Sequence, residues 1–554
     1  MQIVCRKGVA LVVYSAIVAS AFAEPAWAQT AVLYGTVRDR ETGEPLPSAT
    51  VKVQGTALCT KTDAQGKYRL EGVPIGRLEL QASFVGYKPE TIWLQRTGAA
   101  QEVNFALEPH EVEKAEVEVQ SERERAVLQA ATQSIATMSA ADLDKHRGQT
   151  LGETLSQLPG VTILQTGPSI AKPVVRGLHS QRVLVINAGV RQEGQQWGAE
   201  HAPEIDPFAV AKIEVLKGAA SVEYGADAIG GVVRLEPRLL PTEASPKGEL
   251  TLNLFSNNAQ GALSGLLEGK LGEQIGWRVQ ASWRRAGDAA APSYFLTNTG
   301  FTELNFSAHA GYTGDWGELT AYYSRFSTEL GILKSAHIGN VTDLVRSMQR
   351  LQPTITDPFS FAIDFPRQRI SHDLVSLRAS LQMATLGKVQ LAYGYQQNIR
   401  QEFDAHVPIG TDPSRREVPA FDLTLFTHTA EARFQHSPIG KLLGTIGVAL
   451  TAQSNHNLGR AALIPNFAAT TLGGFWREEW VQDNWTLSAG VRYDVRWQSA
   501  SPYGSSRIAQ QLARGEIPNQ QMFQTITGAL GAIWQFAKSG HCECSDSVAT
   551  AQHQ

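Results

Sequence analysis

Strict alternation of apolar and polar residues dominates the second half of the chain. Residues 485–497 are the clearest case, with Trp, Leu, Ala, Val and Tyr at odd positions and Thr, Ser, Gly, Arg and Asp at even positions. Residues 275–283, 375–381 and 389–395 repeat this period of two. Such a period places successive side chains on opposite faces of a β-strand. We therefore expect strands separated by polar turns over residues 247–538.

The two faces of these predicted strands differ in chemistry. Arg492 and Asp494 lie in the middle of a segment whose apolar face ends in Trp485 and Trp497. Charges on one face and aromatic residues at the ends of the other are typical of strands that cross a membrane as a closed barrel. A soluble β-sandwich or propeller with the same period is the alternative. The pattern predicts a mainly β fold with a transmembrane antiparallel β-barrel.

Composition narrows the class further. Hydrophobic residues make up 43% of the 554 residues and charged residues 18%, which is unlike a disordered chain. Beyond the N-terminus no run of about 18 apolar residues occurs, so a transmembrane helix is not expected. The formal net charge of −4 gives no basis for a nucleic-acid partner. The length predicts several domains rather than one core.

The first 28 residues have the pattern of a secretory signal peptide. Arg6 and Lys7 precede an apolar run over residues 9–22, and Ala26-Trp27-Ala28 fits a cleavage site. A short membrane anchor is the alternative. We expect cleavage after Ala28 and export of the remaining chain.

Residues 29–108 contain short alternating segments separated by turn residues, which predicts a small β-sandwich. The charged stretch 109–128 follows and reads as a linker. Within this linker one short segment alternates and has strand propensity, so it is suited to adding to the edge of another protein's sheet; a solvated linker is the alternative. This segment consists of Ala115, Glu116, Val117, Glu118 and Val119.

Residues 129–237 mix helix and strand signals. Thr150 and Glu153 fit a capping box at the start of a helix that Pro159-Gly160 ends. Apolar strands are expected near residues 182–186 and 213–216. The glycines near residue 230 do not form a GxxxxGK[ST] or GxGxxG motif, and no GxSxG or HExxH motif occurs. We therefore expect no enzymatic activity and no cofactor.

Several separated blocks of this region resemble one known domain. LGETLSQLPGVTI, VVRGLHSQRVLVINAGV and KIEVLKGAASVEYGADAIGGVVRL occur in the order of the plug domain of TonB-dependent outer-membrane receptors. The earlier pattern GTVRDRETGEPLPSATVKVQGT resembles the carboxypeptidase regulatory-like domain, a transthyretin-like sandwich. Two features depart from the receptor pattern, because Glu116 and Glu118 interrupt an otherwise hydrophobic segment and Asn187-Ala188-Gly189 replaces a common Asp-Gly turn.

This resemblance implies an α+β plug inside a barrel in the outer membrane of a Gram-negative bacterium. It also implies that Ala115–Val119 is the TonB box, which the energy-transducing TonB complex binds by strand addition. Barrels of this family have about 22 strands. At roughly 20–25 residues per strand and loop, residues 247–538 have room for about 12–14 strands.

An open strand edge is not tolerated in a bilayer, because its backbone groups find no water there. Residues 539–554 lack alternation and end in Gln. We therefore expect a C-terminally truncated receptor with an incomplete barrel and an atypical tail. A smaller barrel that closes is the alternative.

The loop over residues 191–206 is expected at the outward apex of the plug. It carries the candidate ligand-binding residues Glu193, Trp197, Glu200 and His201, of which Glu200 and His201 could ligate a metal ion. His179, His406, His428 and His456 could contribute if the fold brings them close. A polar solvated loop is the alternative.

The sequence thus predicts TonB-energised uptake of a scarce nutrient, with a metal ion or metal chelate as the candidate ligand. The expected partners are the TonB complex, outer-membrane lipid and that ligand. A surface-binding or adhesion protein without transport and a non-functional truncated receptor are the alternatives.

Overall fold

The computed structural model describes residues 31–534 apart from 109–133 and several short segments (41–42, 55, 57, 74–75, 85–86, 88, 97–99, 199, 218–221, 242–244, 337–340, 405–415, 483 and 505–506). The predicted signal peptide, the TonB-box segment Ala115–Val119 and the tail 539–554 lie outside the described residues. The chain divides into two compact units, one before and one after residue 129, and each is described by itself. None of the helices in the described part has the length and apolar character needed to span a bilayer.

The first unit is the expected β-sandwich. One sheet has the order β4-β1-β7, with β8 also pairing with β1, and the other has the order β3-β2-β5-β6. Period-two burial forms the core between the sheets, because Leu78, Leu80 and Ala82 of β5 point inward. The strands are β1 (Ala31–Asp39), β2 (Thr50–Val53), β3 (Cys59–Lys61), β4 (Lys67–Val73), β5 (Gly76–Ser83), β6 (Glu90–Arg96), β7 (Ala100–Glu102) and β8 (Phe105–Leu107).

The second unit begins with an α+β plug built on a five-stranded sheet of order β13-β12-β15-β14-β9. Helix α3 starts at the predicted capping box, where the Thr150 side chain accepts from Glu153 N and the Glu153 side chain accepts from Thr150 N. The elements are β9 (Ser134–Met138), α2 (Ala140–Asp144), α3 (Leu151–Leu155), β10 (Val161–Gly167), β11 (Ile170–Val175), β12 (Val183–Asn187), β13 (Val190–Arg191), β14 (Val210–Lys217) and β15 (Gly231–Pro237).

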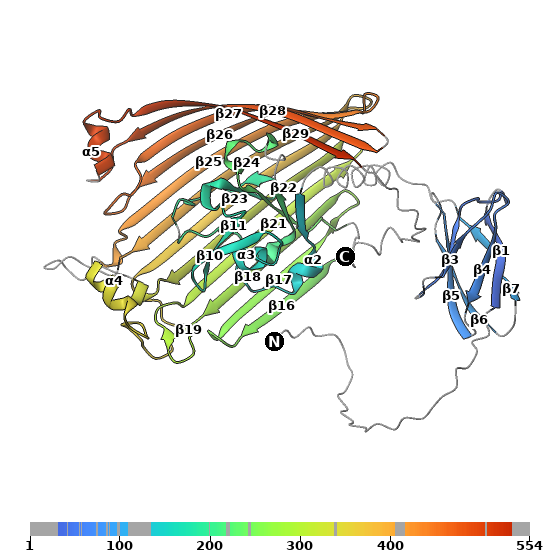
Figure 1. Cartoon of the computed structure of the whole chain (residues 1–554), viewed down its shortest axis with the longest axis horizontal. Helices are drawn as coiled ribbons and strands as arrows, with labels where there is room; N and C mark the ends of the chain where they lie inside the picture. The colour runs from blue at the N-terminus through green and yellow to red at the C-terminus, as the bar shows by residue number, and fades with distance from the viewer. Residues whose placement is uncertain are drawn as a thin grey trace, which may run out of the picture. The chain divides into compact units, whose positions relative to one another are not determined.

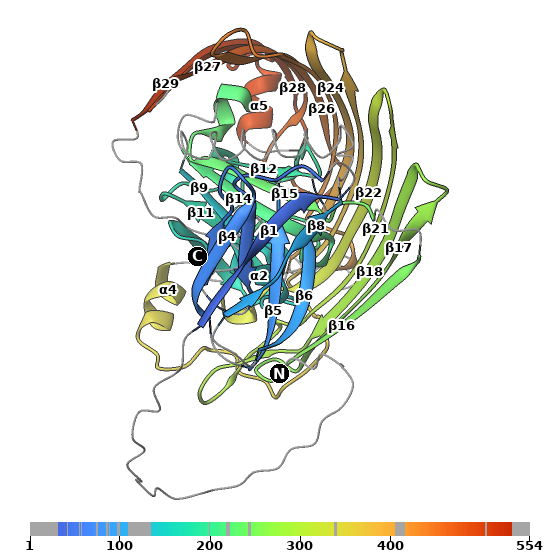
Figure 2. The ribbon, with the colours of Figure 1, turned by 90° about the vertical axis from the view of Figure 1, so that its right-hand side faces the viewer.

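A 12-stranded antiparallel meander follows, and each of its strands pairs with the next along the chain. Figure 2 shows this sheet curving around the plug elements, which lie on its concave side. The strands are β16 (Lys247–Phe255), β17 (Gln260–Leu271), β18 (Ile275–Ala286), β21 (Phe301–Gly314), β22 (Gly317–Gly331), β23 (Arg367–Gln382), β24 (Gly387–Phe403), β25 (Phe421–His436), β26 (Leu442–Asn457), β27 (Asn466–Gln482), β28 (Trp485–Ser501) and β29 (Gln520–Trp534).

The twelve strands found in the described residues agree with the 12–14 expected, and in this part of the chain they form an open sheet. Among the described strands, β16 pairs only with β17 and β29 pairs only with β28. The connections between strands hold the short hairpin β19 (Ala289–Ala290) and β20 (Phe295–Leu296) and the helices α4 (Val341–Met348) and α5 (Arg507–Ala513). Figure 1 shows both helices beyond the same ends of the long strands.

The two ends of the sheet differ in the length of their connections. At one end, two to five residues join successive strands, whereas at the other end 4 to 35 residues do so. We call these ends the short-turn rim and the long-loop rim. Outer-membrane barrels have short turns on the periplasmic side and longer loops outside the cell. By this rule we expect the long-loop rim to be the outward end.

The alternation predicted for residues 485–497 separates two environments. Arg492 and Asp494 are buried on the concave face, next to the plug, whereas Trp485 and Trp497 on the convex face are 45% and 46% exposed. The other predicted strands follow the same rule, since Arg278 is buried and Trp283 is exposed. The expected division of the strands into a polar face toward the plug and an exposed apolar face is confirmed.

Candidate functional site

The apex loop, residues 191–206, lies against one strand of the barrel sheet. The concave face of β24 presents Gln396, Asn398, Arg400 and Glu402 at every second position, because strand side chains alternate. Gln396 binds the start of the loop twice, since its side chain donates to Arg191 O at 2.8 Å and accepts from Glu193 N at 2.8 Å. These residues lie in the half of β24 nearer the long-loop rim, so the loop is at the long-loop side of the plug.

A buried ion pair fastens the C-terminal part of the loop. Arg400 Nη2 donates to Glu204 Oε1 at 2.7 Å, and these side chains are 0% and 2% exposed. Arg400 Nη1 donates to Gln368 Oε1 on β23 at 2.9 Å. Removing one partner of such a pair leaves an uncompensated buried charge, which costs about 3–5 kcal/mol. Loss of either partner should therefore destabilise this position of the loop.

His201 binds the same strand one step further outward. Its Nε2 lies 2.9 Å from Glu402 Oε1, and its Nδ1 is bonded to the carbonyl of Gln195. Trp197 packs edge-on against the imidazole with 4.7 Å between ring centroids. Because both ring nitrogens are engaged, a metal ion could bind His201 only by displacing one of these partners.

Lys172 organises the loop from inside the plug. Its ammonium group donates to Ser180 Oγ at 3.1 Å and to the carbonyls of Gln196 and Gly198. The pKa of Lys172 is lowered to about 8, chiefly by burial and also by the neighbouring Arg400, while Glu204 partly opposes the shift. Sequence reasoning missed this residue, although a lysine within the apolar stretch IAKPVV was a usable signal.

The predicted ligand residues are placed as follows. His201 is buried, Trp197 is half-buried and Glu200 is exposed. The Glu193 side chain pairs with Arg191, which also pairs with Asp227. The described residues contain no group of three or more His, Cys, Asp or Glu side chains that could hold a metal ion.

The further histidines are not gathered at the apex. His428 contacts Tyr393 and Tyr395, and His456 contacts Phe426, all on the convex face of the sheet. His179 lies in the plug, where its Nδ1 is 2.8 Å from Ser180 Oγ. His406 lies outside the described residues.

A second charged contact joins plug and sheet nearer the short-turn rim. The Glu223 carboxylate accepts from Arg433 at 3.1 Å and from Arg477 at 2.7 Å, and Arg492 donates to its backbone carbonyl at 3.0 Å. These arginines come from β25, β27 and β28. Sequence reasoning missed this contact because its partners are more than 200 residues apart.

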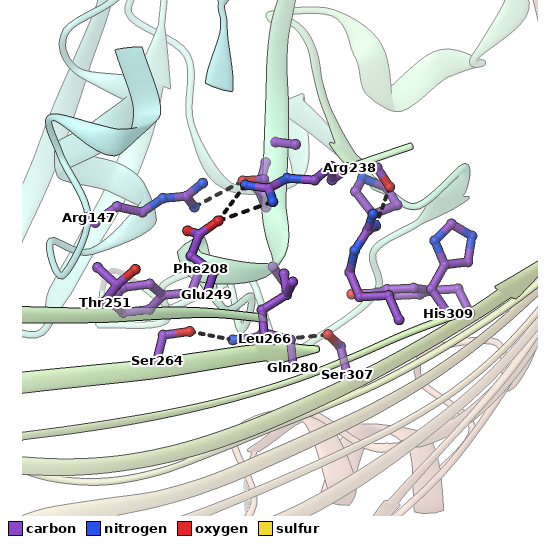
Figure 3. A pocket seen from close by; sticks show the side chains of 16 residues that line it. Arg147, Phe208, Arg238, Glu249, Thr251, Ser264, Leu266, Gln280, Ser307 and His309 are labelled. Carbon is purple, nitrogen blue, oxygen red and sulfur yellow. Dashed lines mark hydrogen bonds and ion pairs between the residues drawn. The ribbon is translucent and has the colours of Figure 1, made fainter. Parts of the chain in front are cut away.

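A small cavity of about 30 Å³ lies between the plug and strands β16–β22 (Figure 3). Arg238 pairs with Glu249 at 3.2 Å across it, and Gln280 links Ser264 and Ser307 along its floor. His309 is buried there, and neither ring nitrogen has a hydrogen-bond partner. A polar cavity of this size can hold ordered water. The space between plug and sheet is thus lined largely by polar side chains.

Comparison with known proteins finds two matching domain families and a similar transporter. Residues 127–232 match the TonB-dependent Receptor Plug Domain, and residues 33–119 match the CarboxypepD_reg-like domain. The vitamin B12 transporter BtuB of Photobacterium profundum is 30% identical over 196 residues, which are 34% of this chain and 32% of that protein.

Solved structures share the fold at low identity. The unliganded ferric citrate transporter FecA has a TM-score of 0.55 at 16% identity and covers 75% of this chain. The FrpB iron transporter from Neisseria meningitidis has a TM-score of 0.57 at 14% identity and covers 73%. This chain covers 62% of each of these two structures.

Proposed function

We propose that this chain, which belongs to the TonB-dependent receptors of the Gram-negative outer membrane, takes part in the energised uptake of a scarce nutrient. One observation carries the proposal. The plug lies on the concave face of a sheet with lipid-type and lumen-type faces, and it is held there through polar and charged groups at two levels. Family members are transporters and not enzymes.

The chemistry of these contacts suits a plug that is fixed at rest and displaced by force. Each neutral hydrogen bond contributes only about 0.5–1.5 kcal/mol, because water replaces the partner when it breaks. The bonds of Gln396 and of Gln195 with Asn455 are of this kind. Among the charged contacts, the fully buried pair of Glu204 with Arg400 should resist separation most strongly, and the partly buried contacts of Glu223 with its arginines less so.

The expected source of the force is the TonB complex, acting on Ala115–Val119. This segment precedes the plug and could pair with a strand of TonB, as extended peptides do at sheet edges. Deleting residues 111–120 should abolish uptake and leave ligand binding unchanged. If the protein is instead a surface-binding or adhesion protein, the deletion should change neither property.

We further propose a metal ion or metal chelate as the ligand, bound at Glu193, Trp197, Glu200 and His201. The position of the apex loop on the outward side supports this, as do relatives described as ferric citrate and iron transporters. Glu200 and His201 are the candidate metal-ligating pair. With Glu200 exposed and His201 bonded to Glu402, ligand entry would exchange the Glu402 contact for one to the ligand.

Two substitutions of His201 separate a ligand role from a structural role. His201→Ala removes both, so ligand affinity and transport should fall. His201→Gln can still donate a hydrogen bond to Glu402 but is a poor metal ligand. Loss of affinity in both variants supports ligand contact. Full affinity in His201→Gln, or in both, contradicts it.

The substrate itself is tested by growth. A receptor-deleted strain complemented by the full-length locus should grow on one of several defined sources of zinc, copper, haem, siderophore or cobalamin, and the strain that lacks the locus should not. Equal growth of both strains on all sources would refute nutrient uptake.

A further inference from the structure

The convex face of the sheet carries a groove that the uptake function does not use. It crosses strands β25–β29 and has a volume of about 630 Å³. The strand register aligns ten of its fourteen lining residues in two rows across the sheet. One row is Phe426, Ser454, Ala468, Ser499 and Gln520, and the other is His428, Ala452, Thr470, Trp497 and Met522. We call this the outer groove.

The shape of the outer groove follows from residue size. Its floor is built from the small side chains of β26 and β27, such as Ala452 and Ala468, together with backbone. Phe426 and His428 of β25 form one wall, and Trp497 and Met522 form the other. Large residues on both sides of a small-residue floor leave a channel that runs along β26 and β27.

The channel has an apolar end and a polar end. Below the two rows, toward the short-turn rim, Leu450 and Leu472 are exposed on the same face. Above them, toward the long-loop rim, His456 and Asn466 occupy the corresponding positions. The two rows contain no Lys, Arg, Asp or Glu. The groove therefore matches a long apolar group with a hydrogen-bonding head at the outward end.

The surface around the groove indicates where a molecule with a long apolar group and a polar head would come from. The groove is continuous with the exposed apolar face of the sheet, which includes Leu450, Val491 and Trp485. In an outer-membrane barrel this face contacts lipid, and its half near the long loops lies in the outer leaflet. We propose that the outer groove binds one acyl chain of an outer-leaflet lipid, with the lipid head near His456.

A groove retains a chain better than the flat lipid face because the chain contacts protein on three sides. Dispersion contacts are individually weak but sum over many atoms. The proposal rests on the membrane location of the family and not on nutrient uptake, so it stands or falls separately.

Tryptophan fluorescence can test this site within the full-length protein. Trp497 lines the groove, and Trp485 lies on the same face of the same strand outside it, stacked on Trp534. The folded protein would be reconstituted in phosphatidylcholine vesicles with increasing fractions of phosphatidylcholine brominated at mid-chain, which quenches nearby tryptophan. The fluorescence of each of these two tryptophans is obtained by subtracting the fluorescence of its Trp→Phe variant from that of the parent protein.

We expect quenching of Trp497 to saturate at a lower brominated fraction than quenching of Trp485. The association constant of lipid at the site beside Trp497 should be about fourfold higher than that of lipid beside Trp485. A factor of this size corresponds to one further buried methylene group. Ala468→Leu fills the floor and should bring the Trp497 curve to that of Trp485, and Ala489→Leu, on the same face outside the groove, should not. Coincident Trp497 and Trp485 curves in the parent, or no effect of Ala468→Leu and Ala452→Leu in folded protein, would overturn the proposal.

Discussion

At the scale of single residues, buried and partly buried charges join the plug to the sheet, and their partners are distant in the sequence. Glu204 and Arg400 are 196 residues apart, and Glu223 and Arg477 are 254 apart. Periodicity shows which residues of a strand share a face, and it predicted that Arg492 lies on the lumen side. It contains no information on which plug residue an arginine will meet, and so the contacts of Arg400 and Glu223 were missed.

The ion pair between Arg400 and Glu204 should contribute strongly to stability. Arg400→Gln leaves Glu204 buried without its cation, and we expect the free energy of unfolding to fall by about 3–5 kcal/mol. Arg514→Gln is the matched control, because its pair with Glu516 is exposed and should change stability by less than about 1 kcal/mol. Denaturant unfolding of the folded chain in micelles measures both. Equal effects would show that burial of the pair is irrelevant.

Lys172 should make stability depend on pH above neutrality. Its pKa is lowered from 10.5 to about 8 in the folded chain. Between these values the unfolded chain binds the extra proton, so stability rises with pH in this interval. Burying the protonated Lys172 lowers the free energy of unfolding by its full amount below pH 8. This loss decreases as the pH rises toward 10.5. Relative to Lys172→Met, the parent should gain stability from pH 7.5 to 10. A constant difference between the two curves would contradict this.

At the scale of elements, the strands and their faces follow from the sequence because a period of two is a local property. The capping box at Thr150 and Glu153 is local too, and it was predicted correctly. The helix itself is shorter than the expected run to Leu158, since α3 ends at Leu155 and a turn follows. The order of the plug sheet, in which β12 pairs in parallel with β15, could not be predicted from local patterns.

Close packing of α3 on β11 depends on one glycine. A Cβ at Gly152 would lie 2.3 Å from the carbonyl oxygen of Ala171, so Gly152→Ala requires the strand to move. The better helix propensity of Ala, worth about 1 kcal/mol, should therefore be exceeded by strain, and we expect a net loss of about 1–3 kcal/mol. Thermal unfolding compares it with Gly167→Ala, where no atom lies within 4 Å. Stabilisation by Gly152→Ala would show that the contact is not tight.

At the scale of the whole second unit, the sheet has two unpaired edges among the described strands, β16 and β29. Backbone groups on an unpaired edge exchange with solvent more readily than those within a sheet. In the folded chain in micelles, the edge-facing amides of β29 should exchange hydrogen for deuterium faster than those of β24, which is paired on both sides. Mass spectrometry of peptides after deuterium labelling measures this. Equal protection would indicate that another strand covers the edge.

The strict period of two has a consequence for how this protein can change in length. A one-residue insertion or deletion within β28 exchanges the two faces of the strand on one side of the change. Arg492 and Asp494 would then face lipid. Trp485 or Trp497 would face the plug, depending on where the residue is added or removed. Point substitutions on the lipid face leave this division intact. Length variation should thus be concentrated in the 4- to 35-residue connections of the outward rim, where extra residues alter only what the cell surface displays.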